Sequence, residues 1–555
     1  MSTILILISI LFLFKLLRDS LFFTWLWQIK EYRIDRMMSY IKDNKNKKGL
    51  LFSAALFLFL YFFIIPENYK AIFVVLVLLY FSVAIFQIIK EIKNRILKRP
   101  VLTFKIMLIF FLLGAVYFLI ALCWFYSSSK MASNLYLLKT SLLLLFVIIV
   151  NPLIISSVIL AIEPIFYFQK KRIIKRAAEK MRGLKKVKVI GITGSYGKTS
   201  TKEFLYSILS QKYKVVKTEG NNNTNIGVAY TVLNKVSDEH DYFICEMGAY
   251  KIGEIKEMCD IVKPSIGILT GINQQHIDLF GSRENIVKGK FELIEALPEE
   301  GLAVLNEKLK TKNEKFKLKV KNLKYFSLDK IKNIKVYQDY AEFEYKNKKL
   351  KLNLLGKHYI ENVLSGIMVA EHLGMTLEEI KNAAEKIRPN EFMMRKLEDL
   401  NNSIFIDDSY SANFDGVLAA LDYLDEAYSN YRKIIIFPGI IELGKERDKI
   451  HKILYDRISE VCDIAYILET GNWKLETGNS LNAKRLHSLE AGTMEPAKEC
   501  EFVFEKDFCK VEEMLKKDLM SPLTSNPPTP LIRGANIVVL FESRGAGAVM
   551  RKLKK

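Results

Sequence analysis

The chain has 555 residues, half of them hydrophobic, and it carries a formal net charge of +21. A chain of this length is expected to hold several domains. The positive charge does not indicate nucleic-acid binding, because no recognised nucleic-acid-binding module accompanies it and part of it flanks apolar runs, as in membrane proteins. The six cysteines are scattered without metal-type pairing, which indicates free thiols in a reducing compartment.

Five apolar runs stand in the first third of the chain. They cover residues 3–14, 50–65, 71–89, 106–124 and 142–162. Three of them approach the ~20 residues that a membrane-spanning helix needs, while the first two are shorter. None has the polar face of a helix in a soluble domain. The first run lacks a basic start and a small-residue cleavage site, so we do not expect a removable signal peptide.

Lysine and arginine alternate between the segments that separate these runs. Residues 28–49, 90–99 and 170–176 are rich in both, whereas residues 66–70 and 127–136 hold one lysine each. Because loops rich in Lys and Arg stay on the cytoplasmic side, this pattern predicts five spans with an outside N-terminus. Everything after about residue 170 is then expected in the cytoplasm.

Residues 187–203 carry the strongest local motif of the chain. A β-branched apolar strand, 187–192, leads into Gly194 and Gly197 and then into a helical pattern. Such a turn aims backbone N–H groups and a helix N-terminus at phosphate. Lys198 is expected to reach the terminal phosphates, and the Thr199 hydroxyl to ligate Mg²⁺. The loop has one glycine fewer than the strict nucleotide-loop pattern.

Further residues with expected chemistry follow two later strands of this block. Tyr242–Glu246 is an apolar strand that ends in a carboxylate, an arrangement that holds Mg²⁺ opposite a phosphate loop. A second buried strand, 266–270, leads to His276, at an edge where ligands bind in parallel sheets. The helix 282–297 then carries Lys288, Lys290 and Glu292.

From residue 185 onward, strands, turns and helices alternate, which predicts α/β layers with a largely parallel sheet. Short alternating segments within the lysine-rich stretch 308–351 predict β-strands with a solvated lysine face. A break at 388–390 separates a second block, with strand-like runs at 404–406, 433–437 and 536–541. The Pro-rich stretch 521–534 is interpreted as an inserted loop without a catalytic role.

These residues resemble one family, the Mur ligases, which are ATP-dependent amide-forming enzymes of peptidoglycan precursor synthesis. Within the family, the branch that adds D-alanyl-D-alanine is the best match. The resemblance covers about residues 185–555, and its motifs keep the family's order. They are Thr193–Ser200, Lys202-Glu203, Gly220–Gly227, Glu246–Ala249, Gly253–Ile255, His276, Phe280–Ser282, Lys288–Glu292, Gly356–His358, Asn362, Arg395, Asp407–Asn413, Glu442–Gly444 and His451.

The resemblance implies a role for each of several residues. Carbon dioxide would carbamylate Lys290, which turns an ammonium that Mg²⁺ repels into an anionic oxygen ligand. The implied catalytic residues are Lys198, Lys290 and His276. The implied ATP contacts are Gly194, Ser195, Tyr196, Gly197, Lys198, Thr199, Ser200, Asn306, Asn362, Arg395 and Asp408. The implied ligands of two Mg²⁺ ions are Thr199, Glu246, His276 and Lys290 as carbamate, and the implied substrate contacts are Asn221, Asn223, Asn225, Ser409 and Asn413.

The sequence departs from the family pattern in several places. Tyr359 and Ser411 stand where Asn is usual, Phe414 replaces Pro, and Phe541-Glu542 replaces a Lys-Gly pair. The usual Asp is missing from Gly439-Ile-Ile. None of these changes removes a phosphate or metal residue, but several touch the amino-substrate side. The family's soluble, uridine-binding N-terminal domain is absent, and the five predicted spans stand in its place.

The predicted fold is therefore a membrane α-helical region followed by α/β domains. Residues 1–168 form the membrane region, and 169–186 are a basic linker. Residues 187–389 form a central P-loop ATPase-like domain with a mostly parallel sheet, and 390–555 form a Rossmann-like C-terminal domain.

The predicted activity is ATP-dependent addition of D-alanyl-D-alanine to a muramoyl-peptide carboxylate through an acyl phosphate. The expected location is the cytoplasmic membrane of a bacterium, as a multi-pass protein with cytoplasmic catalytic domains. Expected partners are the peptide precursor, D-alanyl-D-alanine, the lipid bilayer and other cell-wall enzymes. The alternatives are a membrane-bound ligase that makes poly-glutamate or a lipid-linked peptide, an ATP-driven exporter and a non-catalytic scaffold. No exporter-type Ser-Gly-Gly signature is present in the sequence.

Overall fold

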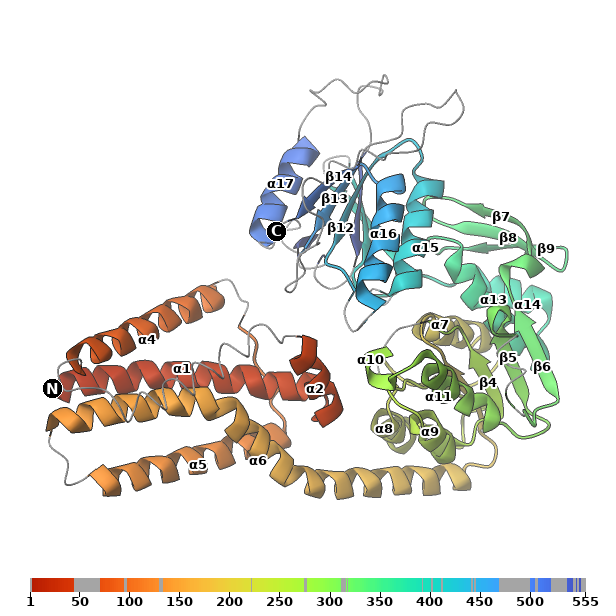
Figure 1. Ribbon diagram of the computed structural model, residues 1–555. Coiled ribbons are helices and arrows are strands. Elements are labelled where there is room, and N and C mark those ends of the chain that lie inside the picture. Colours follow the sequence, from red (N-terminus) through yellow and green to blue (C-terminus); the bar gives the residue numbers. More distant parts are fainter. Residues whose placement is uncertain are drawn as a thin grey trace. The chain divides into compact units, whose positions relative to one another are not determined.

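The structure is a computed structural model of the full chain (Figure 1). It describes residues 2–43, 70–93, 97–128, 133–220, 222–273, 277–310, 316, 318–391, 393–400, 403–410, 413–440, 443, 446–468, 500–504, 508–520, 537–542, 546 and 549–550. The chain divides into two compact units, Met1–Lys171 and Arg172–Lys555.

The first unit consists of long helices. They are α1 (Ser2–Ile29), α2 (Ile34–Asp43), α4 (Lys70–Lys93), α5 (Phe104–Ser128) and most of α6 (Ser133–Gly183). Three described segments are long and apolar enough to cross a membrane, judged by length and composition: 75–93, 104–128 and 139–183. They contain the fourth and fifth predicted spans and most of the third, which lies within α4. The first predicted span lies within α1, which also holds Lys15, Arg18 and Asp19, and the second lies outside the described residues.

Several polar side chains between these helices are hydrogen-bonded to one another. Tyr117 on α5 and Asn151 on α6 are hydrogen-bonded, and the Trp27 indole donates to the Ser156 hydroxyl (3.1 Å). Hydrogen bonds of this kind join helices in an apolar surrounding, where an unpaired polar group is costly. Many large apolar side chains on α4 and α5 remain exposed, among them Phe86 and Phe111 (70% and 73%).

The second unit begins with a six-stranded, fully parallel sheet in the order β2-β3-β1-β4-β5-β6. Alternate residues of β1 point to opposite faces, so Ile190 packs on one side and Val189 on the other. The strands are β1 (Lys188–Thr193), β2 (Val215–Lys217), β3 (Tyr242–Glu246), β4 (Ile266–Leu269), β5 (Leu302–Asn306) and β6 (Asn322–Phe326).

Helices cover both faces of this sheet. The face that carries Ile190 packs on α7 (Lys198–Leu209), α13 (His358–His372) and α14 (Leu377–Ala384). The opposite face packs on α8 (Asn225–Lys235), α9 (Glu254–Val262), α11 (Arg283–Glu295) and the last turns of α6. The short helix α10 (Ile277–Phe280) precedes α11, and two 3₁₀ turns lie at Glu307–Leu309 and Leu328–Lys330.

A small antiparallel sheet follows, made of β7 (Lys332–Val336), β8 (Ala341–Tyr345) and β9 (Lys348–Leu352). Its residues come from the lysine-rich stretch. In β8, Ala341, Phe343 and Tyr345 are buried, whereas the lysines Lys348, Lys349 and Lys351 of β9 are exposed. The prediction of strands with a solvated lysine face is confirmed.

A second six-stranded sheet, in the order β10-β11-β15-β12-β13-β14, forms the C-terminal part, with only β10 antiparallel. Figure 1 shows α15 and α16 over one face of this sheet and α17 over the other. The strands are β10 (Arg395–Leu400), β11 (Ser403–Asp408), β12 (Arg432–Phe437), β13 (Ile464–Ile467), β14 (Glu501–Phe504) and β15 (Ile537–Glu542). The helices are α15 (Phe414–Ala427), α16 (Arg447–Val461) and α17 (Phe508–Met520).

The predicted fold class is confirmed, with apolar N-terminal helices, a parallel central sheet and a second α/β sheet. The predicted division at 389/390 falls between α14 and β10, but it remains a prediction. The Pro-rich stretch 521–534 lies outside the described residues.

Candidate functional site at the phosphate loop

The loop between β1 and α7, residues 194–197, lies at the carboxyl end of a strand in the middle of the parallel sheet. The Thr193 hydroxyl donates to the Met247 carbonyl (2.8 Å), and the Ser195 amide donates to the Gly271 carbonyl (2.7 Å). These bonds tie the loop to the segments that follow β3 and β4. The N-terminus of α7, whose first amides have no partner within the helix, is thereby held at the sheet edge where anions bind.

Two glycines are required by the shape of this loop. Gly197, which precedes α7, has a φ of 74°, in the left-handed region that side chains disfavour. A Cβ at Gly197 would lie 2.6 Å from the Asn362 side-chain oxygen, and a Cβ at Gly194 would lie 2.0 Å from the Thr270 hydroxyl. The glycines therefore allow the loop to pack directly against neighbouring polar side chains.

Lys198 is folded over the loop that it follows. Its Nζ donates to the carbonyls of Gly194 (2.8 Å) and Ser195 (3.3 Å). Burial lowers the pKa of Lys198, and the nearby Glu246 carboxylate acts in the opposite direction. A cation held by weak carbonyl partners at a helix N-terminus is well suited to bind phosphate oxygens.

A cavity of about 350 Å³ opens over the loop, and both domains of the second unit contribute to its wall. The predicted ATP contacts Lys198, Asn362 and Asp408 all line it. The complete set of predicted residues on this wall is Ser195, Tyr196, Gly197, Lys198, Thr199, Ser200, Asn362, Asp408 and Asn413. The wall also includes Lys308 and Glu361, to which the sequence analysis gave no role, and Lys357, which lies in the Gly356–His358 motif but had no assigned role either.

Glu246 ends β3 and is almost fully buried (1% exposed). Its carboxylate accepts hydrogen bonds from the Thr199 hydroxyl (3.2 Å) and the Asn223 side-chain amide (2.9 Å). The fully buried Lys202 ammonium lies 3.0 Å from the other oxygen, as an ion contact rather than an aligned hydrogen bond. The chain's own donors thus fix this carboxylate in place.

This arrangement fits Mg²⁺ that is shared with phosphates. Among the described residues, no group of three or more His, Cys, Asp or Glu could hold a metal by itself. Proteins usually hold Mg²⁺ through one or two carboxylates together with substrate phosphates and water. Glu246 with the adjoining Thr199 hydroxyl supplies the protein's part of such a site.

Lys290 is buried on α11, whereas Lys288, two residues earlier, is exposed. Residues two apart on a helix point about 200° apart, so only one of them can face the core. The Lys290 Nζ lies 3.5 Å from the Ala249 carbonyl oxygen and 5.8 Å from the centre of the Phe280 ring. Burial, followed by the Lys198 cation, lowers the pKa of Lys290 to about 7. Much of this lysine is therefore neutral at neutral pH.

On the C-terminal side, Arg395 does not line the cavity but pairs with Asp407 through Nη2 (3.0 Å) and Nε (3.2 Å). The Ser409 hydroxyl donates to the other oxygen of Asp407 (2.6 Å). Asn413 caps α15 by accepting the Gly416 amide (3.1 Å). Of the residues predicted here, only Asp408 and Asn413 belong to the cavity wall.

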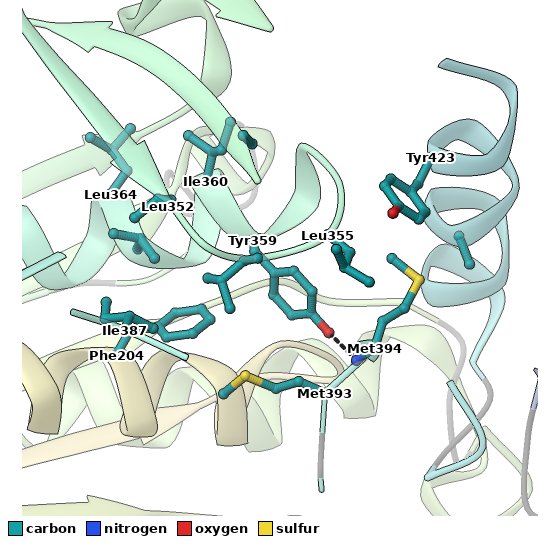
Figure 2. Packing of buried hydrophobic residues seen from close by; sticks show 14 of the residues in the cluster. Phe204, Leu352, Leu355, Tyr359, Ile360, Leu364, Ile387, Met393, Met394 and Tyr423 are labelled. Carbon is teal, nitrogen blue, oxygen red and sulfur yellow. Dashed lines mark hydrogen bonds between the residues drawn. The ribbon is translucent and has the colours of Figure 1, made fainter. Parts of the chain in front are cut away.

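Tyr359, one of the departures from the family pattern, has a structural position that the sequence did not reveal. Figure 2 shows its hydroxyl bonded to the Met394 amide, which donates at 2.7 Å, and its ring beside Phe204. The two rings meet edge to face, with centroids 5.8 Å apart. Tyr359 therefore connects α7 and α13 of the central domain to the segment that leads into β10.

The remaining predicted residues lie near the cavity or outside the described part of the chain. The Asn306 side-chain oxygen accepts a hydrogen bond from the backbone amide of Lys308 (3.0 Å). Lys308 lines the cavity, whereas Asn306 does not. The Asn225 side chain donates to Glu257 (2.7 Å) at the start of α8. His276 and Asn221 lie outside the described residues.

Lys202 contacts Glu246, but the sequence analysis assigned it no role. It follows Lys198 by four residues, so both lie on one side of α7. This spacing could have indicated that a second lysine faces the sheet edge.

Comparison with known proteins finds relatives that share the central region. Residues 192–370 match the family model described as the Mur ligase middle domain. The chain is similar to the UDP-N-acetylmuramoyl-tripeptide–D-alanyl-D-alanine ligases of Borreliella burgdorferi (33% identical; 51% of this chain, 62% of the relative) and Escherichia coli (30% identical; 51% and 64%). The match therefore spans less than two thirds of the length of each of these relatives.

Solved structures agree in fold. The crystal structure of MurF from Acinetobacter baumannii has a TM-score of 0.57 at 22% identity and covers 70% of this chain and 81% of that one. MurF ligase from Thermotoga maritima in complex with ADP has a TM-score of 0.55 at 24% identity and covers 69% and 83%.

Proposed function

Because residues 192–370 match the Mur ligase middle domain, we propose that the chain is an ATP-dependent ligase that adds D-alanyl-D-alanine to a muramoyl-peptide carboxylate. The observation that carries the proposal is the cavity that the phosphate loop, with Lys198 and Thr199, shares with Asp408 and Asn413 of the C-terminal sheet. Such a cavity can hold a nucleotide on one wall and a second substrate against the other.

In this proposal, the reaction proceeds in two steps, through an acyl phosphate. A carboxylate oxygen of the peptide attacks the γ-phosphorus of ATP, an O–P bond forms, and the bond to the β-phosphate oxygen breaks to release ADP. The amine then attacks the carbonyl carbon of the acyl phosphate, a C–N bond forms, and phosphate leaves with the electrons of the broken C–O bond. Lys198 and the amides at the start of α7 stabilise the charge that develops on the phosphate oxygens.

Thr199 and Glu246 are proposed to hold Mg²⁺, which would neutralise phosphate charge during transfer. Asn223 keeps Glu246 oriented, and Lys202 balances its charge when no metal is bound. His276, taken from the family pattern, is proposed as a ligand of a second Mg²⁺.

Lys290 is proposed to carry a carbamate. Its nitrogen would attack carbon dioxide, form an N–C bond and lose a proton, which leaves an anionic oxygen ligand. The buried ammonium has only a carbonyl as hydrogen-bond acceptor in the described part of the chain, and a carbamate would remove this unfavourable charge.

The N-terminal helices are proposed to insert into the cytoplasmic membrane of a bacterium, with the catalytic domains in the cytoplasm. Exposed apolar surface on α4 and α5 supports insertion, because soluble proteins rarely leave so many neighbouring apolar side chains in water. The lipid bilayer would then be a partner, and other cell-wall enzymes could dock beside it.

The test is a product assay with the full chain purified in detergent. The protein is incubated with ATP, Mg²⁺, D-alanyl-D-alanine and a muramoyl tripeptide, supplied either as the uridine-diphosphate conjugate or linked to lipid. A product that is heavier by one condensed D-alanyl-D-alanine supports the proposal, and the acceptor that reacts identifies the carrier. In a parallel reaction that contains glutamate in place of the dipeptide, incorporation of glutamate would favour the ligase that makes another polymer. A lack of ATP-dependent condensation with any acceptor would overturn ligase activity.

A further inference from the structure

Two carboxyl groups meet at the carboxyl end of the C-terminal sheet. Strands β11 and β15 are parallel neighbours, and Asp408 and Glu542 are aligned as the last residue pair. Asp408 lines the cavity over the phosphate loop, whereas Glu542 is fully buried (0% exposed). Glu542 thus lies beside a residue of the cavity wall, on the side turned away from water.

Glu542 has no hydrogen-bond partner at either carboxyl oxygen within the part of the chain that the structure describes. The Asp408 carboxyl group lies close enough to share a proton with Glu542. Burial raises the pKa of both groups, and this contact raises the pKa of Glu542 and lowers that of Asp408. The Arg395 guanidinium, on the neighbouring strand β10, pairs with Asp407 instead. A buried carboxylate without a donor is costly, so a native protein that keeps one is expected to use it.

Among the residues that the structure describes, the groups that shift the pKa values of this pair are acidic. The Tyr359 hydroxyl lies near enough that both carboxylates raise its pKa, although burial contributes more. Burial raises the pKa of Asp408, and Asp407 raises it further. Burial and Asp408 raise the pKa of Glu542. All four groups are acidic, so the environment favours either a bound proton or a bound cation.

We propose that this pair receives the ammonium group of the incoming amino substrate, with Asp408 as the contact and Glu542 as the second negative charge behind it. The inference rests on the proposed ligase function and names the part of the cavity that binds the amine. An ammonium has three N–H donors, which matches the oxygens that lack partners. A carboxylate has about four acceptor sites, so Asp408 can contact the nucleotide and the amine together.

The pair also offers a destination for a proton. The ammonium cannot attack the acyl phosphate until its nitrogen regains a lone pair. One proton passes to the carboxyl pair, the nitrogen attacks the carbonyl carbon, and a second proton leaves with the released phosphate. Phe541 and Glu542 stand where the resembled family has a Lys-Gly pair, so this chain has a negative residue in place of a positive one in this segment.

The test compares two ligands that differ only in charge. D-alanyl-D-alanine and D-lactoyl-D-alanine, in which a hydroxyl replaces the amine, are titrated into the full chain in detergent with ADP and Mg²⁺. The wild type should bind the dipeptide at least about tenfold more tightly, since a charged hydrogen bond contributes about 1.5–3 kcal/mol. Glu542→Gln should lose most of this preference, and Glu542→Asp should recover part of it. Glu501→Gln, an exposed carboxylate of the same sheet, should leave the preference unchanged.

Kinetics separate this inference from the proposed function. In Glu542→Gln the KM for the dipeptide should rise about tenfold, while the KM for ATP stays within about twofold of wild type. If the wild type condenses the dipeptide but Glu542→Gln keeps both its KM and its preference for the amine, the pair only shares a proton and the inference fails. If the wild type forms no product with any acceptor, the ligase function itself fails. Thermal unfolding of each variant shows whether it is folded.

Discussion

Two buried glutamates end parallel strands in the two sheets of the catalytic unit, and their surroundings differ. Glu246 ends β3 and is held by Thr199, Asn223 and Lys202. Glu542 ends β15, and within the described chain its oxygens have no hydrogen-bond partner. The phosphate side is therefore organised before a ligand arrives, whereas the C-terminal side retains a charge that a ligand can satisfy. This difference is the basis for proposing a metal and phosphate on the first side and a cationic group on the second.

The largest effect is expected from Lys198→Ala, which removes the cation from the organised side. ATP turnover should fall by about a thousandfold or more, since charge stabilisation during phosphoryl transfer is lost. The variant should remain folded, because Lys198 contacts only loop carbonyls. Lys288→Ala, an exposed lysine, serves as the control in a phosphate-release assay. Near-wild-type turnover in Lys198→Ala would contradict the assignment of the nucleotide site.

Lys290→Ala tests the next largest effect on the same side. Activity should fall by about a hundredfold because an anionic ligand is lost, while Lys288→Ala stays active. Acetate or formate in the assay should restore part of the activity by supplying the missing carboxylate oxygens. Full activity of Lys290→Ala without additives would remove the carbamate from the mechanism.

Lys202→Met tests, through the free energy of unfolding, whether Glu246 and Glu542 differ in their surroundings. It leaves Glu246 buried without its cation and should lower the free energy of unfolding by about 3–5 kcal/mol. Lys212→Met, which removes a lysine from an exposed pair with Glu379, should leave the free energy of unfolding nearly unchanged, because water screens such a pair. Glu542→Gln should cost nothing or stabilise, because it removes an uncompensated charge. Chemical denaturation measures all three, and equal losses in Lys202→Met and Glu542→Gln would erase the distinction between the two sides.

Tyr359→Phe should have a smaller effect. The Met394 amide would lose its acceptor in a buried place, at a cost of about 1–3 kcal/mol. Tyr431→Phe, at the edge of the same core, is the matched control. A thermal midpoint of Tyr359→Phe that equals that of the control would show that the bond to Met394 does not stabilise the fold.

The pH dependence of stability is the subtlest test. The folded state raises the pKa of Asp408 from 3.8 to about 7, so it retains a proton that the unfolded chain releases. The resulting stabilisation is present below pH 3.8 and is lost as the pH rises through about 7. Thermal unfolding between pH 5 and 8, roughly the range in which such a carboxyl titrates, should show stability falling with pH, and Glu542→Gln should flatten the slope. If the pH dependence of stability is the same in Glu542→Gln as in the wild type, the Asp408 and Glu542 carboxyl groups do not influence each other's titration.

Local patterns were sufficient to predict the phosphate-loop side. The glycine loop, Lys198 and Thr199 are contiguous, and helical periodicity already separated Lys290 from Lys288. The C-terminal side could not be predicted in this way. Asp408 and Glu542 become neighbours only because β15 lies between β11 and β12, an order that no local pattern encodes. Tyr359 was noticed as a departure, but its contact with Met394 depends on the packing of separate elements.

The central place of β15 has a consequence for biosynthesis. A nascent chain that has not yet reached Ile537 leaves β11 and β12 with facing, unpaired edges, because the strand between them has not been translated. The phosphate loop can form on the ribosome long before this point. The acidic pair is completed only with Glu542, so the proposed amine site would be completed after the proposed nucleotide site.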